Sequence, residues 1–184
     1  MSEILTCLEG NPVIAAIGDD KWKEALCSPV QLVFYMSANL LTLREKVRQA
    51  HDANKFIMVH LDLAEGIGRD RSGIRYIAQC GADGIISTKS QLIRFGKEMG
   101  LFTVQRFFAI DSGGTESIGD MFQSTRPNLM EIMPGVVTKV IRKYAECGIP
   151  VIAGGLIETK AEVVNALSCG ATAVSTGKQD LWYI

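Results

Sequence analysis

The stretch Cys80-Gly81-Ala82-Asp83-Gly84-Ile85-Ile86-Ser87-Thr88 contains one complete step of a pattern that runs along the chain. A glycine stands where a helix would end, a short apolar run follows, and two hydroxyl residues come next. Glycine suits the left-handed backbone just past a helix C-terminus, and a short β-branched run predicts a strand. About half the chain further on, Cys169-Gly170-Ala171-Thr172-Ala173-Val174-Ser175-Thr176 repeats this step. The echo suggests two similar halves, although the same local pattern is common in other α/β proteins.

Eight such apolar runs occur along the 184 residues, and they are continuous rather than alternating. They are Val13–Ile17, Val30–Tyr35, Phe56–Asp62, Gly84–Ser87, Phe102–Arg106, Leu129–Met133, Val151–Ala153 and Ala173–Ser175. Continuous runs are expected where helices cover the outer face of a parallel sheet. We therefore predict an α/β fold, a compact (β/α)8 TIM-type barrel with short loops, spanning residues 1–184 as a single domain. The alternative is an open, doubly wound sheet.

Helical patterns lie between these runs. Two apolar stripes are formed by Leu40, Leu43, Val47 and Ala50 and by Val136, Val137, Val140, Ile141 and Tyr144. Thr88–Gln91 and Thr159–Glu162 have the spacing of capping boxes at helix starts. Gly81, Gly100, Gly148 and Gly170 each stand where a helix would end and a strand follow. Strand, helix and glycine thus alternate regularly, as in a βα barrel.

Composition limits the classes of function. The formal net charge is −1, so no overall field attracts the chain to nucleic acid or to anionic membranes. The five cysteines form no CxxC pair and no secretory signal precedes them, which indicates reduced thiols and a cytoplasmic location. Neither histidine is near a cysteine and no apolar run approaches about 20 residues, so we expect no metal site and no membrane span.

The strongest functional signal comes from the last two predicted strands. Gly154 and Gly155 follow the seventh strand, where they allow a ligand to approach the backbone closely. Ser175, Thr176 and Gly177 follow the eighth, where we expect a short final helix whose free N–H groups suit a dianion. This pair of loops is the recurring phosphate site of barrels, so we predict a small phosphate ester as ligand. The alternative is a pair of tight turns that need small residues.

Other polar residues are predicted at the same end of the barrel. Alternation along the third strand places His60 and Asp62 on one face, either as a polar floor for ligand hydroxyls or as a buried network with a helix N-terminus. Thr88, after the fourth strand, is expected to be a plain helix cap.

The fifth and sixth strands also end in polar residues. Arg106 ends the fifth strand and could bind an anion, or pair with Glu131 or Asp111. Glu131 lies between apolar neighbours on the sixth strand, so we expect it to point into the barrel and accept bonds from hydroxyls. Gly135, after Pro134, forms the following turn and is also predicted to be part of the ligand site.

At these residues the chain resembles the glycerol uptake operon antiterminator regulatory protein family. The resemblance covers nearly the whole length and is carried by five segments in order. They are His60–Gly66 (HLDLAEG), Asp83–Thr88 (DGIIST), Gln105–Ser112 (QRFFAIDS), Glu131–Gly135 (EIMPG) and Ile152–Ile157 (IAGGLI). The glycine-rich piece alone has low specificity, whereas the five together at this length are quite specific.

The resemblance implies a barrel that senses glycerol-3-phosphate and contacts leader mRNA, so that transcription of glycerol-use genes continues past a terminator. It also implies that Gly154, Gly155, Ser175 and Thr176 hold the phosphate. By the same resemblance Asp62, Glu65, Arg106 and Glu131 line the pocket. The chain departs from the family pattern at Gly177, where serine is usual, and at Lys89, where arginine is common.

Three classes of function remain open at this point. The first is a ligand-responsive regulator with no catalytic residue and no cofactor. The second is a phosphate-binding enzyme of the isomerase, aldolase or phosphodiesterase type, although no strand-end lysine is seen for a Schiff base, since Lys55 precedes its strand. The third is a barrel that binds a flavin phosphate. Oligomeric state is left open.

Overall fold

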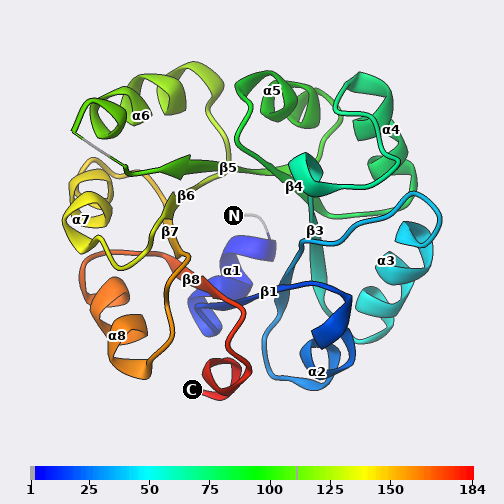
Figure 1. Ribbon diagram of the computed structural model, residues 1–184, viewed down its shortest axis with the longest axis horizontal. Helices are drawn as coiled ribbons and strands as arrows, with labels where there is room; N and C mark the ends of the chain where they lie inside the picture. Colours follow the sequence, from blue (N-terminus) through cyan, green and yellow to red (C-terminus); the bar gives the residue numbers. More distant parts are fainter. Residues whose placement is uncertain (1–2, 111) are drawn as a thin grey trace.

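The structure is a computed structural model that describes residues 3–110 and 112–184, with side chains for all of these except 112–117. Parallel strands close into a barrel in sequence order, with helices around it (Figure 1). The strands are β1 (Val13–Ile17), β2 (Leu32–Tyr35), β3 (Phe56–His60), β4 (Gly84–Ser87), β5 (Phe102–Phe108), β6 (Leu129–Met133), β7 (Val151–Gly154) and β8 (Ala173–Thr176). The predicted barrel class is confirmed, and the two echoing segments lead into β4 and β8, on opposite sides of the ring.

The helices follow the strands in alternation after an N-terminal helix. They are α1 (Glu3–Gly10), α2 (Trp22–Cys27), α3 (Leu43–Asp52), α4 (Arg71–Gln79), α5 (Ser90–Glu98), α6 (Ser112–Thr125), α7 (Thr138–Glu146) and α8 (Lys160–Ser168). Short 3-10 helices span Asp19–Lys21, Leu61–Leu63 and Gln179–Tyr183. No helix among the described residues is both long and apolar enough to cross a membrane.

The strands bury both of their faces, which explains their unbroken apolar sequence. One set of side chains, including Ile14, Leu32 and Val104, fills the barrel interior. The alternating set, including Ala15 and Val33, packs against the surrounding helices. Because successive side chains on a strand point to opposite faces, a strand covered on both sides has to be apolar throughout.

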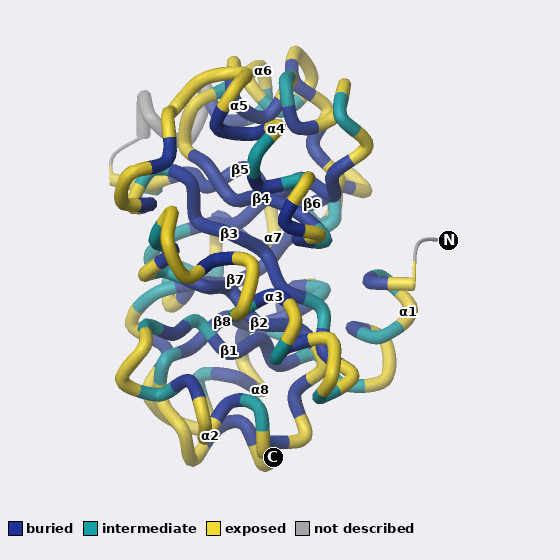
Figure 2. The backbone as a smooth tube through the Cα atoms, turned by 90° about the vertical axis from the view of Figure 1, so that its right-hand side faces the viewer, coloured by how far each residue is buried: buried dark blue, intermediate teal, exposed yellow. Residues whose placement is uncertain are grey.

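Helix α1, which the sequence analysis did not predict, closes the N-terminal end of the barrel. Ile4 and Leu8 are buried and belong to the same apolar cluster as Ile14 and Leu32 of the interior. In Figure 2 this helix lies at one end of the molecule, beside the buried strands. Two buried positions in eight residues make too weak an apolar stripe to detect in sequence. Because α1 covers this end, a binding site is expected at the opposite end of the barrel.

Most predicted helix ends are confirmed. Thr159 and Glu162 form the full capping box of α8. The glycines after four helices have left-handed φ values, which are +90° at Gly81, +77° at Gly100, +73° at Gly148 and +95° at Gly170. The other capping box was wrong, because Lys89 is the N-cap residue of α5 and Thr88 bonds elsewhere.

Some predicted boundaries were also wrong. Leu40 precedes α3, and Val136 and Val137 precede α7, so the two stripes begin before their helices. Strand β3 ends at His60, where the backbone turns into the 3-10 helix Leu61–Leu63. The apolar character of the sequence continues across these points, so only the backbone geometry marks the change.

Candidate functional site

A pocket of about 410 Å³ opens at the C-terminal ends of the strands. Six of the ten predicted site residues line it, namely Arg106, Glu131, Gly155, Ser175, Thr176 and Gly177. Its walls also include the segment after β1 and the loops after β7 and β8, with Lys21, Leu156, Glu158 and Lys178 among their side chains. The pocket therefore lies between the two loops that the sequence singled out.

The loop after β7 has a backbone that favours glycine. Gly155 has a φ of +73°, and Leu156, which follows it, also lies in the left-handed region at +60°. A Cβ atom on Gly154 would overlap the carboxylate of Glu131 and would lie 2.7 Å from Oγ of Ser175. Gly154 therefore makes room for a contact beneath the loop and does not itself line the pocket, in contrast to Gly155.

Gly135 supports the same loop from the neighbouring strand. Its N–H donates to the carbonyl oxygens of Gly154 at 2.5 Å and Gly155 at 3.0 Å. A side chain here would lie 2.8 Å from backbone atoms of Ala153 and Gly154. Gly135 is outside the pocket lining, so its contribution to the site is to hold the glycine loop in place.

The hydroxyl groups at the end of β8 are engaged with the protein. Oγ1 of Thr176 donates to the carbonyl of Ile157 at 2.8 Å and accepts from the N–H of Lys178 at 3.1 Å. The 3-10 helix begins only at Gln179, so the expectation that Ser175, Thr176 and Gly177 open the final helix was wrong. The strand extends through Thr176 instead.

A backbone donor remains available beside these engaged hydroxyls. The N–H of Gly177 donates to no acceptor among the described residues, whereas the pairing of Gly154 with Ser175 directs the N–H of Gly155 back into the β7–β8 ladder. Gly155 and Gly177 line the pocket from its two loops. Free backbone N–H groups are well suited to an anion, so this rim can bind one without any hydroxyl side chain.

A buried polar network forms the floor of the pocket. Nε of Arg106 donates to one carboxylate oxygen of Glu131 at 2.6 Å, and Oγ of Ser175 donates to the other at 2.6 Å. Glu131 is fully buried and points into the barrel, as the sequence predicted. The pairing of Arg106 with Glu131 was one of the alternatives considered; the other partner, Asp111, lies outside the described residues.

Asp62 is engaged in a local network. Its carboxylate accepts bonds from Oγ of Ser87 at 2.6 Å, from Oγ1 of Thr88 at 2.8 Å and from the Thr88 N–H at 2.7 Å. Burial raises its pKa, but these hydrogen bonds outweigh that effect and hold the pKa below its usual value. This arrangement corresponds to the second interpretation of the strand end, a network with a helix N-terminus, and Asp62 is outside the pocket lining.

His60 differs from its neighbours because its buried ring has an unsatisfied nitrogen. The side chain is 3% exposed, and Nδ1 has no hydrogen-bond partner among the described residues. Burial lowers its pKa, and the positive charge of Arg106 lowers it further. The ring is therefore neutral near pH 7.

Glu65 is separated from the pocket. It is exposed and accepts a hydrogen bond from Nδ2 of Asn39 at 3.1 Å, while its backbone bonds to Ala38 and Leu40. These contacts join the loop after β3 to the loop after β2. The structure therefore brings the predicted residues of β5, β6, β7 and β8 together and leaves Glu65 in a different part of the rim.

Sequence reasoning missed two lysines in the lining, Lys21 and Lys178. Nζ of Lys21 donates to the carbonyl of Gly177 at 2.7 Å, and Lys178 faces Glu158 at 3.4 Å. Lys21 lies four residues after β1, which puts it at the same end of the barrel. That position in the βα rhythm was the available signal, but a single lysine in a short polar segment does not stand out from a solvated surface residue.

No group of three or more His, Cys, Asp or Glu residues in the described part of the chain is arranged to hold a metal ion. A backbone donor, lysine ammonium groups and a floor made of Arg106, Glu131 and Ser175 instead characterise this pocket. The closed barrel and the pocket at its C-terminal mouth define the class of protein, a (β/α)8 barrel with a site suited to a small polar anion.

Comparison with known proteins identifies the family. Residues 13–182 match the family described as "Glycerol-3-phosphate responsive antiterminator". The chain belongs to this family.

Individual relatives agree with the family match. The chain is 32% identical over 182 residues to the uncharacterized protein YgcP of Escherichia coli K12, covering 97% of this chain and 95% of the relative. The glycerol uptake operon antiterminator regulatory protein of Listeria monocytogenes superposes with a TM-score of 0.88 at 30% identity, covering 94% of this chain and 95% of that one. A glycerol uptake operon antiterminator-related protein of Thermotoga maritima gives 0.84 at 33% identity, covering 92% and 96%.

More distant structures share the fold alone. Deoxyribose phosphate aldolase from Aeropyrum pernix is 12% identical with a TM-score of 0.68, covering 97% of this chain and 94% of the aldolase. At that identity the likeness confirms the barrel and says nothing about chemistry.

Proposed function

We propose that the pocket at the mouth of the barrel binds glycerol-3-phosphate and that binding controls antitermination on leader mRNA in the cytoplasm. The observation that carries the proposal is a pocket bordered by two glycine-containing loops, where the free N–H of Gly177 and the ammonium group of Lys21 lie together. Donors of this kind suit a phosphate, and the family is described as responsive to glycerol-3-phosphate.

The buried floor suits the glycerol part of the ligand. Glu131 and Arg106 both line the pocket, and each keeps some hydrogen-bonding capacity beyond the bonds within the network. A carboxylate has about four acceptor positions and a guanidinium has five donors. Two neighbouring hydroxyl groups can therefore donate to the one and accept from the other.

Binding is tested by thermal unfolding with glycerol-3-phosphate and with glycerol. At a ligand concentration about a hundredfold above Kd, binding to the folded state adds about 2.7 kcal/mol, which raises Tm by roughly 5–10 °C for a chain of this length. Glycerol should give no comparable shift, because it lacks the anion. Equal shifts for both, or none for the phosphate ester, would refute the proposed ligand.

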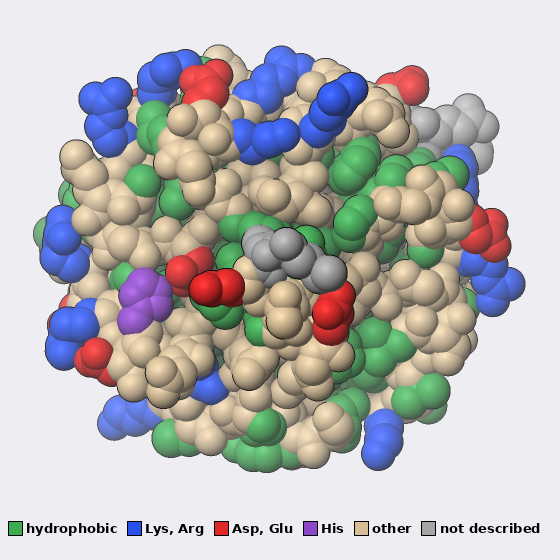
Figure 3. All heavy atoms as spheres, turned by 180° about the vertical axis from the view of Figure 1, so that it is seen from behind, with side chains coloured by type: hydrophobic (Ala, Val, Ile, Leu, Met, Phe, Trp, Pro, Cys, Tyr) green, Lys and Arg blue, Asp and Glu red, His purple; other side chains and the backbone are tan. Residues whose placement is uncertain are grey.

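The RNA contact needs its own test. The end of the barrel opposite the pocket carries lysine and arginine side chains along the edge where α4, α5 and α6 lie (Figure 3). A gel shift on leader RNA, with and without glycerol-3-phosphate, should show ligand-dependent binding, and a salt titration gives the number of phosphates contacted. Sedimentation of the same samples reports the oligomeric state.

An enzyme is the second candidate, because the neutral, buried His60 lies near the carboxylates of Asp62 and Glu131. Incubation with glycerol-3-phosphate followed by product analysis separates the two. Recovery of unchanged ligand supports a sensor, whereas turnover that is lost in His60→Gln supports acid or base catalysis.

A further inference from the structure

The pocket lining contains three cations, and their partners differ. Arg106 is paired with Glu131 at 2.6 Å, and Lys178 faces Glu158 at 3.4 Å. Lys21 has no carboxylate within salt-bridge distance among the described residues, and its Nζ donates to the carbonyl of Gly177. The other two charges are compensated, so the net positive charge of the lining is due to Lys21.

The contact of Lys21 with Gly177 places its ammonium group at the proposed anion site. Gly177 contributes a free N–H to that site, while its carbonyl oxygen is held by Nζ at 2.7 Å. An ammonium group has three donors, so one bond to the carbonyl leaves two for a ligand. The bond also offsets the partial negative charge of an oxygen that would otherwise repel an anion.

The backbone on both sides of Lys21 is tethered to α3. On one side, Asp19 forms an ion pair with Lys46 at 2.5 Å and accepts from the hydroxyl of Tyr35 at 2.9 Å. On the other side, Trp22 is buried, and the ammonium of Lys46 lies 4.6 Å from its ring centroid. The segment that carries Lys21 is therefore fixed at both ends.

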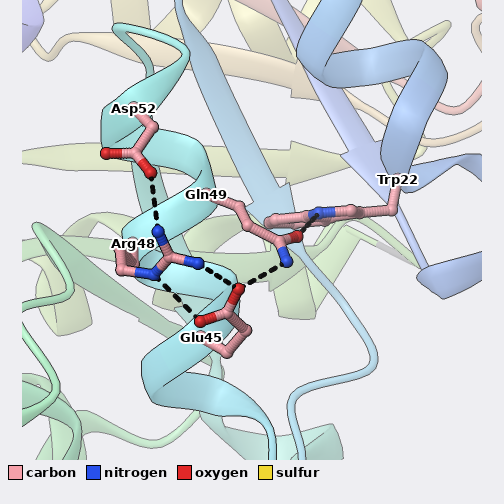
Figure 4. A network of polar contacts seen from close by, with 5 residues as sticks. All are labelled: Trp22, Glu45, Arg48, Gln49 and Asp52. Atoms are coloured by element: carbon pink, nitrogen blue, oxygen red, sulfur yellow. Dashed lines mark hydrogen bonds and ion pairs between the residues drawn. The ribbon is translucent and has the colours of Figure 1, made fainter.

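Figure 4 shows the continuation of this anchor along α3. Nε1 of Trp22 donates to Gln49 at 2.7 Å, and Gln49 donates to Glu45 at 2.8 Å. Arg48 binds both oxygens of Glu45 and also contacts Asp52 at 3.1 Å. Exposed ion pairs contribute little to stability individually. Here they hold Glu45 in place, and Glu45 in turn holds the side-chain amide of Gln49, whose oxygen accepts the indole N–H of Trp22. Lys21 is thus held at the pocket with reduced conformational freedom.

We infer that Lys21 is the residue that makes the pocket select a dianionic phosphate monoester over a singly charged diester or a neutral polyol. This inference rests on the proposed function and attributes the charge selectivity of that same site to Lys21. The backbone N–H of Gly177 binds either anion, whereas a full positive charge distinguishes ligands by their charge. Charge-assisted hydrogen bonds are roughly twice as strong as neutral ones, so the preference should be large enough to measure.

The test is calorimetric titration of the full chain at pH 7.5 with glycerol-3-phosphate and with its methyl diester, which carries one negative charge. Lys21→Met keeps an unbranched side chain that is one atom shorter and removes the charge. We expect it to weaken binding of the monoester by about thirtyfold and that of the diester by about threefold, in line with the strength of charge-assisted bonds. Lys21→Arg should restore most of the preference.

Lys23→Met is the matched control, because Lys23 is exposed on α2 two residues away and is not part of the pocket lining. It removes the same charge and should change both affinities by less than about twofold, since exposed charges are screened. Lowering the pH from 7.5 to 5.5 provides a second readout. A phosphate monoester has its second pKa near 6, so the wild type should lose affinity for it while Lys21→Met changes little.

The outcomes are separable. Equal losses of affinity for both esters in Lys21→Met would mean that Lys21 only connects two segments of the rim. The inference would then be wrong. Unchanged affinities would overturn it as well. A wild type that binds neither ester would refute the proposed function and the inference together, whereas selective loss for the monoester supports both.

Discussion

The two ends of the barrel each contain a lysine that bonds to backbone carbonyls, and the two lysines differ in what remains free. At the N-terminal end Lys55 is 7% exposed, and its Nζ donates to the carbonyls of Ser28 at 2.7 Å and Val30 at 2.6 Å. At the mouth Lys21 donates to a single carbonyl and lines an open pocket. One end satisfies its polar groups internally, while the other leaves donors for a ligand.

This difference is the one expected in a barrel, where residues at the N-terminal face stabilise the fold and residues at the C-terminal face bind ligands. The N-terminal end is closed by the buried side chains of helix α1, whereas the mouth contains a buried charged network under a glycine-rich loop. Substitutions at the N-terminal end should therefore change stability alone. Substitutions at the mouth should change ligand affinity, with or without stability.

The largest effect is expected from Glu131→Ala. Removing the carboxylate leaves the buried guanidinium of Arg106 unpaired, which should lower the free energy of unfolding by about 4 kcal/mol and abolish ligand binding. Urea unfolding and calorimetry measure the two quantities. The double variant Arg106→Met, Glu131→Leu should recover most of the stability without binding. Full stability in Glu131→Ala alone would contradict the network.

The next largest effect is expected at the N-terminal end of the barrel. Leu8→Ala in α1 removes a side chain that is 1% exposed, so the free energy of unfolding should fall by about 3 kcal/mol with ligand affinity unchanged. Glu9→Ala, on the exposed side of the same helix, should alter stability by less than about 0.5 kcal/mol. A loss of affinity in Leu8→Ala would show that the two ends are not independent.

Gly155→Asp probes the mouth with little effect on the core. A carboxylate at the rim should repel the phosphate and weaken binding by more than about a hundredfold, while the left-handed backbone costs about 1 kcal/mol of stability. Gly100→Asp is the matched control, because Gly100 has a φ of +77° and open space around it. It lies before β5, at the other end of the barrel, so it should show the same backbone strain with unchanged affinity. It lacks only the displacement of Met133, whose Cε would lie 2.6 Å from a Cβ atom on Gly155.

The smallest effect is a pH dependence of the free energy of unfolding, which is due to His60. Burial and the charge of Arg106 depress its pKa in the folded state, so the unfolded chain binds an extra proton as pH falls below about 6.5. Stability should therefore decrease from pH 7 towards pH 5.5, by at most about 1.4 kcal/mol per pH unit for this one proton. Urea unfolding at several pH values gives the slope.

The slope should disappear in His60→Gln and persist in His51→Gln, since His51 is exposed and pairs with Asp83 at 3.0 Å. Asp62 titrates separately. Its pKa is held below the usual value of a carboxyl group, so the stability it contributes is lost only at pH values below about 4. A wild-type slope that is unchanged in His60→Gln would rule out His60 as its source.

The sequence determined the barrel and the location of the candidate site because both depend on local signals. The φ preference of Gly81 or Gly170 and the apolar β-branched runs act over a few residues, so their positions give the βα rhythm directly. Gly155, Ser175 and Gly177 were found in the same way, since they follow the last two strands. Helix α1 was missed because its apolar stripe is short.

Only the tertiary structure decided which polar groups are free. Ser175 meets Glu131 across 44 positions of sequence, and Lys21 meets Gly177 across 156. The first contact joins β6 to β8 inside the barrel, and the second exists because closing the barrel brings β1 beside β8. No local pattern encodes either contact. The turn of the chain after His60 likewise directed Asp62 to Ser87 and Thr88. Backbone preferences are local, whereas the pairing of charges depends on closure. The sequence alone therefore predicts the rim of the candidate site and not its charge.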